Sequence, residues 1–155
     1  MELSQKDFQL IASLRKNNRQ KLTKLSRELR MPVKKIQEKL QKYNDKIISK
    51  HTILLNFDKL GFMTRTNIII AVKSEDKNKI QDFLVKHPEV NNLYQVNNGY
   101  DFLIELITRN DEQLDIFMQN LETEFDIKRK DFQYILKDIK REMFIANKLL
   151  IPDKI

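Results

Sequence analysis

The chain has 155 residues, enough for one ordinary domain or two small ones, and its hydrophobic content of 41% is sufficient to form a core. It contains no cysteine, which excludes disulfides and thiolate metal sites, and its two histidines lie far apart, so we expect no metal site and no cofactor of that kind. No apolar run approaches the roughly 20 residues of a membrane-spanning helix, and the N-terminus does not resemble a secretion signal, so we expect a cytoplasmic protein without a membrane partner.

The formal net charge of +7 is unevenly distributed along the chain. Residues 1–50 contain 14 Lys or Arg and 5 acidic residues, a net charge of +9, whereas residues 51–155 contain 15 and 17, a net charge of −2. Attraction to phosphate depends on where charges lie. The positive charge in the first third of the chain therefore favours a polyanionic partner there over a merely solvated basic surface.

Three short helices are predicted at the start of the chain. Ser4 is suited to cap the first helix, with Asp7 three residues on, and apolar residues recur at helical spacing until residue 17. The second helix covers residues 22–29. Pro32 is tolerated in a first helical turn, where its missing N–H would have no partner, so it opens a third helix that reaches about Tyr43. The inward side of this third helix consists of Val33, Ile36, Leu40 and Tyr43.

The second and third helices, joined by a turn of three or four residues, have the proportions of a helix-turn-helix whose last helix enters the major groove of DNA. Lysine donates to guanine or phosphate, glutamine pairs with adenine and glutamate accepts from cytosine. A solvated helix face is the alternative. The outward residues predicted to read DNA bases are Lys34, Lys35, Glu38 and Gln41. The basic residues predicted to contact phosphates, which adds affinity without sequence information, are Arg19, Lys21, Lys24, Arg27, Arg30, Lys42, Lys46 and Lys50.

Residues 47–55 are rich in β-branched side chains and are predicted to form an extended strand, either the wing of the DNA-binding domain or the link to the next one. We therefore expect a helix-turn-helix domain over residues 1–50 and a linker strand over residues 51–62. The remaining residues, 63–155, are expected to form the second domain.

The second domain shows strand and helix patterns in alternation. Its predicted elements are a strand from Thr64, a helix over 76–87, strands over 90–96 and 101–108 joined by the turn Asn97-Asn98-Gly99, a helix from Asn110 or Asp111, and a strand over 132–139. This β-α-β-β-α-β order is ferredoxin-like, so the fold class is α+β. The expected core residues are Phe102, Ile104, Leu106, Leu114, Phe117 and Leu121. The tail, residues 140–155, has partly helical propensity.

The order of these pieces is more specific than any one of them. With LTKLSRELRMPVKKIQEKL as the helix-turn-helix, LLNFDKLGF as the junction and YQVNNGYDFLIEL in the second domain, the chain resembles the leucine-responsive and asparagine-regulator (Lrp/AsnC) family. The resemblance implies homodimers formed by pairing of β-sheets, which assemble further into tetramers or octamers. It also implies an amino-acid effector bound near the hairpin turns. The residues so implicated are Asn97, Asn98, Gly99 and Asp101, although a hairpin that needs a positive φ at Gly99 explains the same pattern.

Three positions depart from the family pattern. Relatives often have Gly where this chain has Arg30, and Ser or Thr where it has Pro32, as the cap of the recognition helix. Lys46 stands where many relatives have Gly before the wing strand. DNA binding remains the expected function, but the target sequence of the relatives does not carry over.

Two other functions compete with that of a sequence-specific regulator of transcription that binds double-stranded DNA. An architectural DNA-binding protein would use the same lysine-rich face with little sequence dependence. Siroheme decarboxylases resemble the same two-domain family, but they carry histidine and arginine where residues 91–106 of this chain have Tyr94 and neither of those residues. We therefore expect no catalytic residues and no enzyme.

Overall fold

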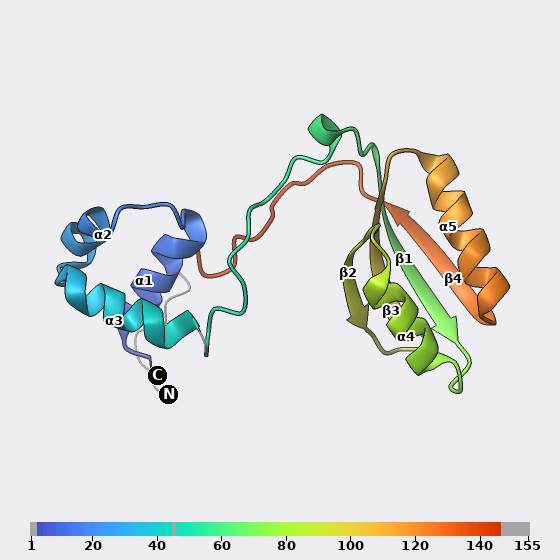
Figure 1. Cartoon of the computed structure of the whole chain (residues 1–155), viewed down its shortest axis with the longest axis horizontal. Helices are drawn as coiled ribbons and strands as arrows, with labels where there is room; N and C mark the ends of the chain where they lie inside the picture. The colour runs from blue at the N-terminus through green and yellow to red at the C-terminus, as the bar shows by residue number, and fades with distance from the viewer. Residues whose placement is uncertain (1–2, 45, 147–155) are drawn as a thin grey trace. The chain divides into compact units, whose positions relative to one another are not determined.

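The protein was analysed as a computed structural model that describes residues 3–44 and 46–146 (Figure 1). These residues form two compact units. The N-terminal unit contains the described residues up to Ile53 together with those from Ile139 onward, and the C-terminal unit is Leu54–Asp138. The chain thus enters the C-terminal unit once and returns to the N-terminal unit, whereas we expected all of 63–155 to form one domain.

The N-terminal unit contains the three predicted helices, α1 (Gln5–Lys16), α2 (Leu22–Leu29) and α3 (Val33–Asn44). Apolar residues spaced three or four apart put one stripe of each helix into a shared core. Ser4 is the N-cap of α1 as expected, and its N–H donates to the Asp7 carboxylate at 2.8 Å, which is the reciprocal bond of a capping box. The buried members of this core are Leu10, Leu25, Leu29, Met31, Ile36 and Tyr43.

The turn between α2 and α3 explains two of the departures from the family pattern. Arg30 ends α2 in the left-handed conformation, with φ 47° and ψ 52°, and the following N–H of Met31 donates to the Ser26 carbonyl at 3.1 Å. Glycine adopts this conformation most easily, which accounts for its frequency in relatives. Pro32 precedes α3, and its carbonyl accepts the N–H of Ile36 at 3.1 Å, so a side-chain cap is absent but the backbone bond is made.

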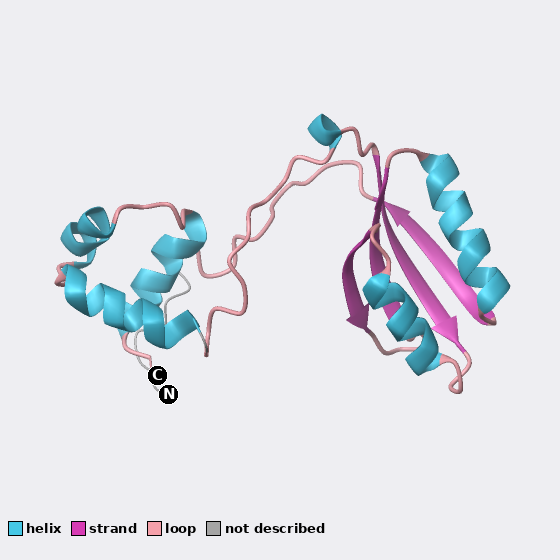
Figure 2. Cartoon of the chain, viewed as in Figure 1, coloured by secondary structure: helices cyan, strands magenta, loops and turns pink. Residues whose placement is uncertain are grey.

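The prediction of a strand over residues 47–55 is wrong. The N–H groups of Ile47 and Ile48 donate to the Tyr43 carbonyl, which closes a turn after α3, and the chain continues as a loop to the short helix η1 (Asp58–Leu60) (Figure 2). The β-branched composition of residues 47–55 favours extended backbone, but a strand also requires a regular ladder of backbone hydrogen bonds with a neighbouring strand. The described residues of the N-terminal unit therefore contain no wing strand.

The C-terminal unit is a four-stranded antiparallel sheet in the order β2-β3-β1-β4, which confirms the ferredoxin-like arrangement (Figure 1). Both of its helices pack on one face of the sheet, because their apolar stripes join the same buried cluster as alternate residues of β1 and β3. The elements are β1 (Thr64–Val72), α4 (Lys77–Lys86), β2 (Val90–Gln95), β3 (Phe102–Thr108), α5 (Asp111–Glu124) and β4 (Ile127–Tyr134). The expected core residues Phe102, Ile104, Leu106, Leu114, Phe117 and Leu121 are all buried.

The last strand lies about five residues earlier than predicted, at Ile127–Tyr134 instead of 132–139. Its register places Tyr134 opposite Thr66 and Phe132 opposite Ile68, so β1 has almost no backbone left to pair with later residues. β4 is an edge strand with a largely exposed, polar sequence, and backbone pairing rather than an apolar pattern defines it. A search for apolar alternation therefore misses it.

The tail was predicted to be partly helical. Its described residues, 140–146, form bends and turns instead, and residues 147–155 lie outside the described part. The tail joins the N-terminal unit through an ion pair of 2.8 Å between Arg15 on α1 and Glu142. Among the helices that the structure describes, none has the length and apolar character needed to cross a bilayer.

Arg30→Gly should raise the free energy of unfolding by about 0.5–1 kcal/mol, because relief of the left-handed strain exceeds the added entropy of glycine in the unfolded chain. Arg27→Gly removes the same charge from within α2, and it should lower the free energy of unfolding by about 1 kcal/mol. Urea unfolding of both variants measures the two effects, and a loss of stability in both would contradict the assignment of strain to Arg30.

Candidate nucleic-acid interface

The residues predicted to read bases share the exposed side of α3. Lys34, Lys35, Glu38 and Gln41 are all exposed, whereas Ile36 and Tyr43 on the other side are buried. This split follows from the 3.6-residue repeat, which separates the apolar positions from the outward ones. The exposed groups offer ammonium, amide and carboxylate functions on a single helix, which are the functions that contact base edges in a major groove.

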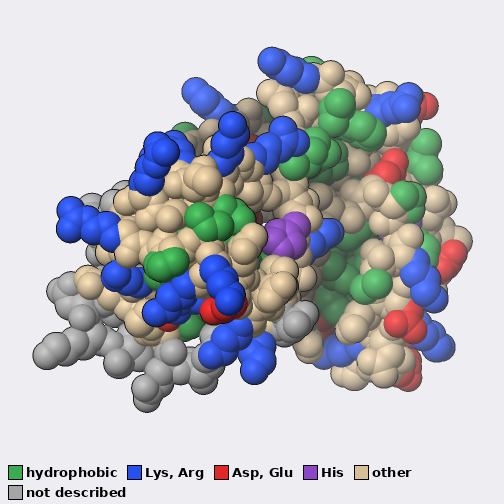
Figure 3. Space-filling model, turned by 60° about the vertical axis from the view of Figure 1, so that its left-hand side comes forward, with side chains coloured by type: hydrophobic (Ala, Val, Ile, Leu, Met, Phe, Trp, Pro, Cys, Tyr) green, Lys and Arg blue, Asp and Glu red, His purple; other side chains and the backbone are tan. Residues whose placement is uncertain are grey.

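The residues predicted to contact phosphates are also exposed. They lie on the segment before α2, on α2 itself, in the turn after it, at the end of α3 and in the loop that follows. Within the described residues, Lys24 alone of this set forms an ion pair, a long contact of 3.8 Å to Glu28. Figure 3 shows lysine and arginine side chains over much of the face that the N-terminal unit turns toward the viewer. The charges are therefore available for an anionic partner.

A buried polar network connects α1 to α3, and the sequence analysis did not identify it. The carboxylate of Asp7, a residue that is only 5% exposed, accepts hydrogen bonds from the Tyr43 hydroxyl and the Lys39 ammonium on α3, and from the Ser4 N–H and hydroxyl. Burial alone would raise the pKa of Asp7, but these hydrogen bonds outweigh it and hold that pKa well below its usual range. The sequence showed Asp7 only as a local capping residue; the helical spacing of Lys39 and Tyr43 is the signal that could have suggested a shared partner.

The predicted hairpin turn is confirmed. Asn98 and Gly99 have φ values of 67° and 85°, so both adopt the left-handed conformation. A Cβ built on Gly99 would lie 2.8 Å from Nη2 of Arg129, which itself donates to the Gly99 carbonyl. The same guanidinium stacks over the Tyr100 ring, with its central carbon 4.2 Å from the ring centroid. Gly99 thus allows both the left-handed turn and the close approach of Arg129 from β4.

The Asp101 carboxylate has structural partners on both oxygens. One oxygen accepts the Val72 N–H at 2.8 Å and the other lies 2.6 Å from the Lys77 ammonium. Partial burial alone would raise the pKa of Asp101, but the bonds from Lys77 and Val72 outweigh it and lower that pKa. The carboxylate therefore ties the hairpin to the end of β1 and the start of α4.

The face of the sheet opposite the helices combines apolar and paired charged groups. Ile69, Leu103 and Ile107 alternate on this face with the residues that point to the core. Arg65 and Glu105 form an ion pair of 2.7 Å in their midst, and Asn91 donates to the same Glu105 carboxylate at 2.7 Å. Burial alone would raise the pKa of Glu105, yet these donors lower it. The charges are thus neutralised within the chain.

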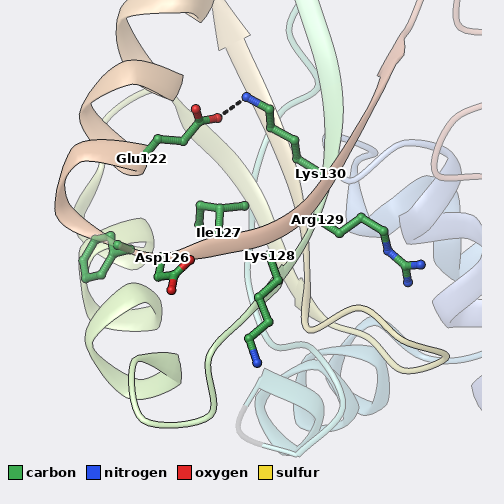
Figure 4. A pocket seen from close by; sticks show the side chains of 7 residues that line it. Glu122, Asp126, Ile127, Lys128, Arg129 and Lys130 are labelled. Carbon is green, nitrogen blue, oxygen red and sulfur yellow. Dashed lines mark hydrogen bonds and ion pairs between the residues drawn. The ribbon is translucent and has the colours of Figure 1, made fainter.

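A hollow of about 440 Å³ lies between the end of α5 and β4. Figure 4 shows that its basic side chains do not converge on one point: Lys130 turns to Glu122, while Lys128 and Arg129 point elsewhere. In the described part of the chain, no three His, Asp or Glu side chains gather in a way that would hold a metal ion. His87 packs edge-on to Phe117, with ring centroids 4.8 Å apart, and is the C-cap of α4.

Comparison with known proteins relates this arrangement to one family. Residues 67–144 match the model of the Lrp/AsnC ligand-binding domain. The chain belongs to the Lrp/AsnC family. It is 27% identical over 113 residues to the HTH-type transcriptional regulator FL11 of Pyrococcus furiosus, which covers 72% of this chain and 75% of that protein.

Solved structures of this family share the fold. E. coli AsnC aligns with a TM-score of 0.80 at 19% identity, covering 91% of this chain and 97% of that chain. A transcriptional regulator from Neisseria meningitidis, solved as a complex with L-Met, aligns with a TM-score of 0.81 at 17% identity, covering 90% and 94%. At these identities the likeness concerns the fold and does not extend to the side chains of a site.

Asp101→Asn should lower the free energy of unfolding by on the order of 1–3 kcal/mol at pH 7, because it removes a charged acceptor of two groups. The pKa of Asp101 is lower in the folded state than in the unfolded chain. The contribution of its charge to the free energy of unfolding is therefore complete above about pH 4, near the pKa of an Asp in the unfolded chain, and it is lost as pH falls through the lower pKa of the folded state. Urea unfolding between pH 7 and pH 3 measures this. Asp82→Asn, on the exposed side of α4, is the control, and a gap between wild type and Asp101→Asn that does not shrink in acid would contradict the role of the charge.

Proposed function

We propose that the chain is a transcription regulator that binds specific sequences of double-stranded DNA. The observation that carries the proposal is the exposed side of α3, whose amide and charged groups are surrounded by exposed basic residues on a helix-turn-helix. Its membership of the Lrp/AsnC family and its likeness to regulators such as FL11 support the proposal. The action is one of binding, and no residue is assigned to catalysis.

An architectural DNA-binding protein is the second candidate. The exposed lysines and arginines favour it as strongly as they favour a regulator, because phosphate contacts carry no sequence information. The two candidates differ in what α3 contributes. In a regulator its outward residues contact base edges, whereas in an architectural protein they add only charge.

The regulator is proposed to act as a homodimer, with tetramers or octamers as further assemblies. The open face of the sheet is the surface that fits a second copy, because it presents Ile69 and Leu103 around a charge pair that is already neutralised. Burial of such a face against its own symmetry mate removes apolar area from water without leaving a charge unpaired.

An amino acid is the proposed effector, and the Neisseria meningitidis relative that was solved with L-Met supports this class. Asn97, Asn98, Gly99 and Asp101 remain the residues of the proposed site. The existing bonds of Asp101 favour a role in holding the turn, so a ligand would be received by the neighbouring amides and backbone. DNA titrations repeated with each amino acid test the proposal, which fails if none changes the affinity.

Lys35→Ala should lower the discrimination between a specific and a scrambled duplex by about tenfold, because one good base contact is worth about 1–3 kcal/mol. The specific duplex is obtained by enrichment of wild-type binders from a randomised library, and affinity is measured by fluorescence anisotropy at two salt concentrations. Lys79→Ala, a lysine on the exposed side of α4, is the matched control. Failure of the wild type to enrich any sequence, with equal salt-sensitive binding to all duplexes, would establish the architectural alternative.

Leu103→Asp should weaken the dimer by about a hundredfold, because it places an unpaired carboxylate in the centre of the proposed interface. Analytical ultracentrifugation over a range of concentrations measures the change. Ile116→Asp places the same charge at an exposed apolar position on α5 and should leave the dimer intact. Identical sedimentation of wild type and Leu103→Asp would exclude this face as the dimer surface.

A further inference from the structure

The network around Asp7 lies beneath the face of α3 that is proposed to read DNA. A hollow of about 240 Å³ is lined by Asp7, Lys39 and Tyr43 together with Lys35 and Glu38. The first three belong to the network and the last two to the outward side of α3. A shift of α3 over α1 would therefore change the network and the position of the outward side chains together.

The hydrogen bonds fix α3 in a way that its apolar contacts do not. Ile36 and Leu40 pack against apolar neighbours, and such contacts are non-directional, so they tolerate a small rotation or slide of the helix. Lys39 and Tyr43 lie four residues apart on one side of α3 and both donate to the same oxygen of Asp7. Two donors on successive turns that share one buried acceptor allow little rotation about the helix axis and little movement along it.

Asp7 is itself held in place. The Ser4 N–H donates to its second oxygen at 2.8 Å and the Ser4 hydroxyl at 2.7 Å, so the carboxylate is anchored to the first turn of α1 before it contacts α3. Its side chain is 8% exposed and that of Lys39 is 22% exposed, which removes most of the solvent screening from the pair. The acceptor is therefore held by α1 through bonds that do not depend on α3.

We infer that Asp7 is a positioning residue for DNA recognition: through Lys39 and Tyr43 it sets the rotation of α3 that presents the outward side chains to base edges. This inference rests on the proposed function. A carboxylate is suited to this role because it accepts from several donors at once, which an amide cannot do with equal strength. Loss of the Asp7 charge should therefore change base discrimination more than it changes the number of phosphate contacts.

Asp7→Asn should lower the discrimination between the enriched and the scrambled duplex by about tenfold, while the salt dependence of binding stays within about one phosphate contact of the wild type. Tyr43→Phe keeps the ring and removes one donor, so it should lower discrimination by a smaller factor. Asp82→Asn makes the same substitution on the exposed side of α4, away from the proposed interface, and is the matched control. Circular dichroism and thermal unfolding establish that each variant is folded at the temperature of the titration.

A double variant separates positioning from stability. Asp7→Asn with Lys39→Met removes both charges, so stability should recover relative to Asp7→Asn, because no buried charge is left unpaired. Discrimination should remain low. If discrimination recovers together with stability, or if folded Asp7→Asn and Tyr43→Phe read sequence as well as the wild type, the inference is overturned while the proposed function stands. If the wild type itself does not discriminate, both are overturned.

Discussion

A small helical unit can bury a charge only if the charge is fully paired, and this constraint organises the N-terminal unit. The core of the three helices consists of one apolar stripe from each, and Asp7 lies beside it with four donors around its two oxygens. Removal of one partner would leave the carboxylate or the Lys39 ammonium uncompensated in a poorly solvated place. The arrangement of α1 and α3 is therefore fixed by directional hydrogen bonds as well as by apolar packing.

The two units differ in whether their surface charges are paired with opposite charges. In the N-terminal unit the cations predicted to contact DNA are exposed, and among the described residues only Lys24 of this set forms an ion pair with a carboxylate. In the C-terminal unit the ion pair on the open face of the sheet is formed within the chain, because Arg65 pairs with Glu105 and also with Asp138 at 2.8 Å. A surface with unpaired cations suits a polyanion, whereas an apolar surface with neutralised charges suits a second protein surface. The same division follows from the net charges of +9 and −2 in the sequence.

Most of the fold is predictable from the sequence because periodicity reports which side of an element is buried. The helices, the hairpin at Gly99 and strands β1 to β3 follow from such patterns. The pattern misplaces β4, which is largely exposed and joins the sheet through backbone pairing without an apolar alternation. It also wrongly predicts a strand over residues 47–55, because local propensity does not report whether a regular ladder of hydrogen bonds forms. The exposed residues of the candidate site could be identified in the same way. For the Asp7 network the spacing of Lys39 and Tyr43 could suggest a shared partner but not which residue it is, since the bonds join residues 32 and 36 positions apart.

The return of the chain makes the N-terminal unit discontinuous in sequence. Its described residues are those up to Ile53 and those from Ile139 onward, and Arg15 on α1 pairs with Glu142 across that division. The sequence boundary of the DNA-binding unit is therefore not a single cut: a fragment that ends at Ile53 lacks the segment that returns to it, and Arg15 in such a fragment has lost its carboxylate partner.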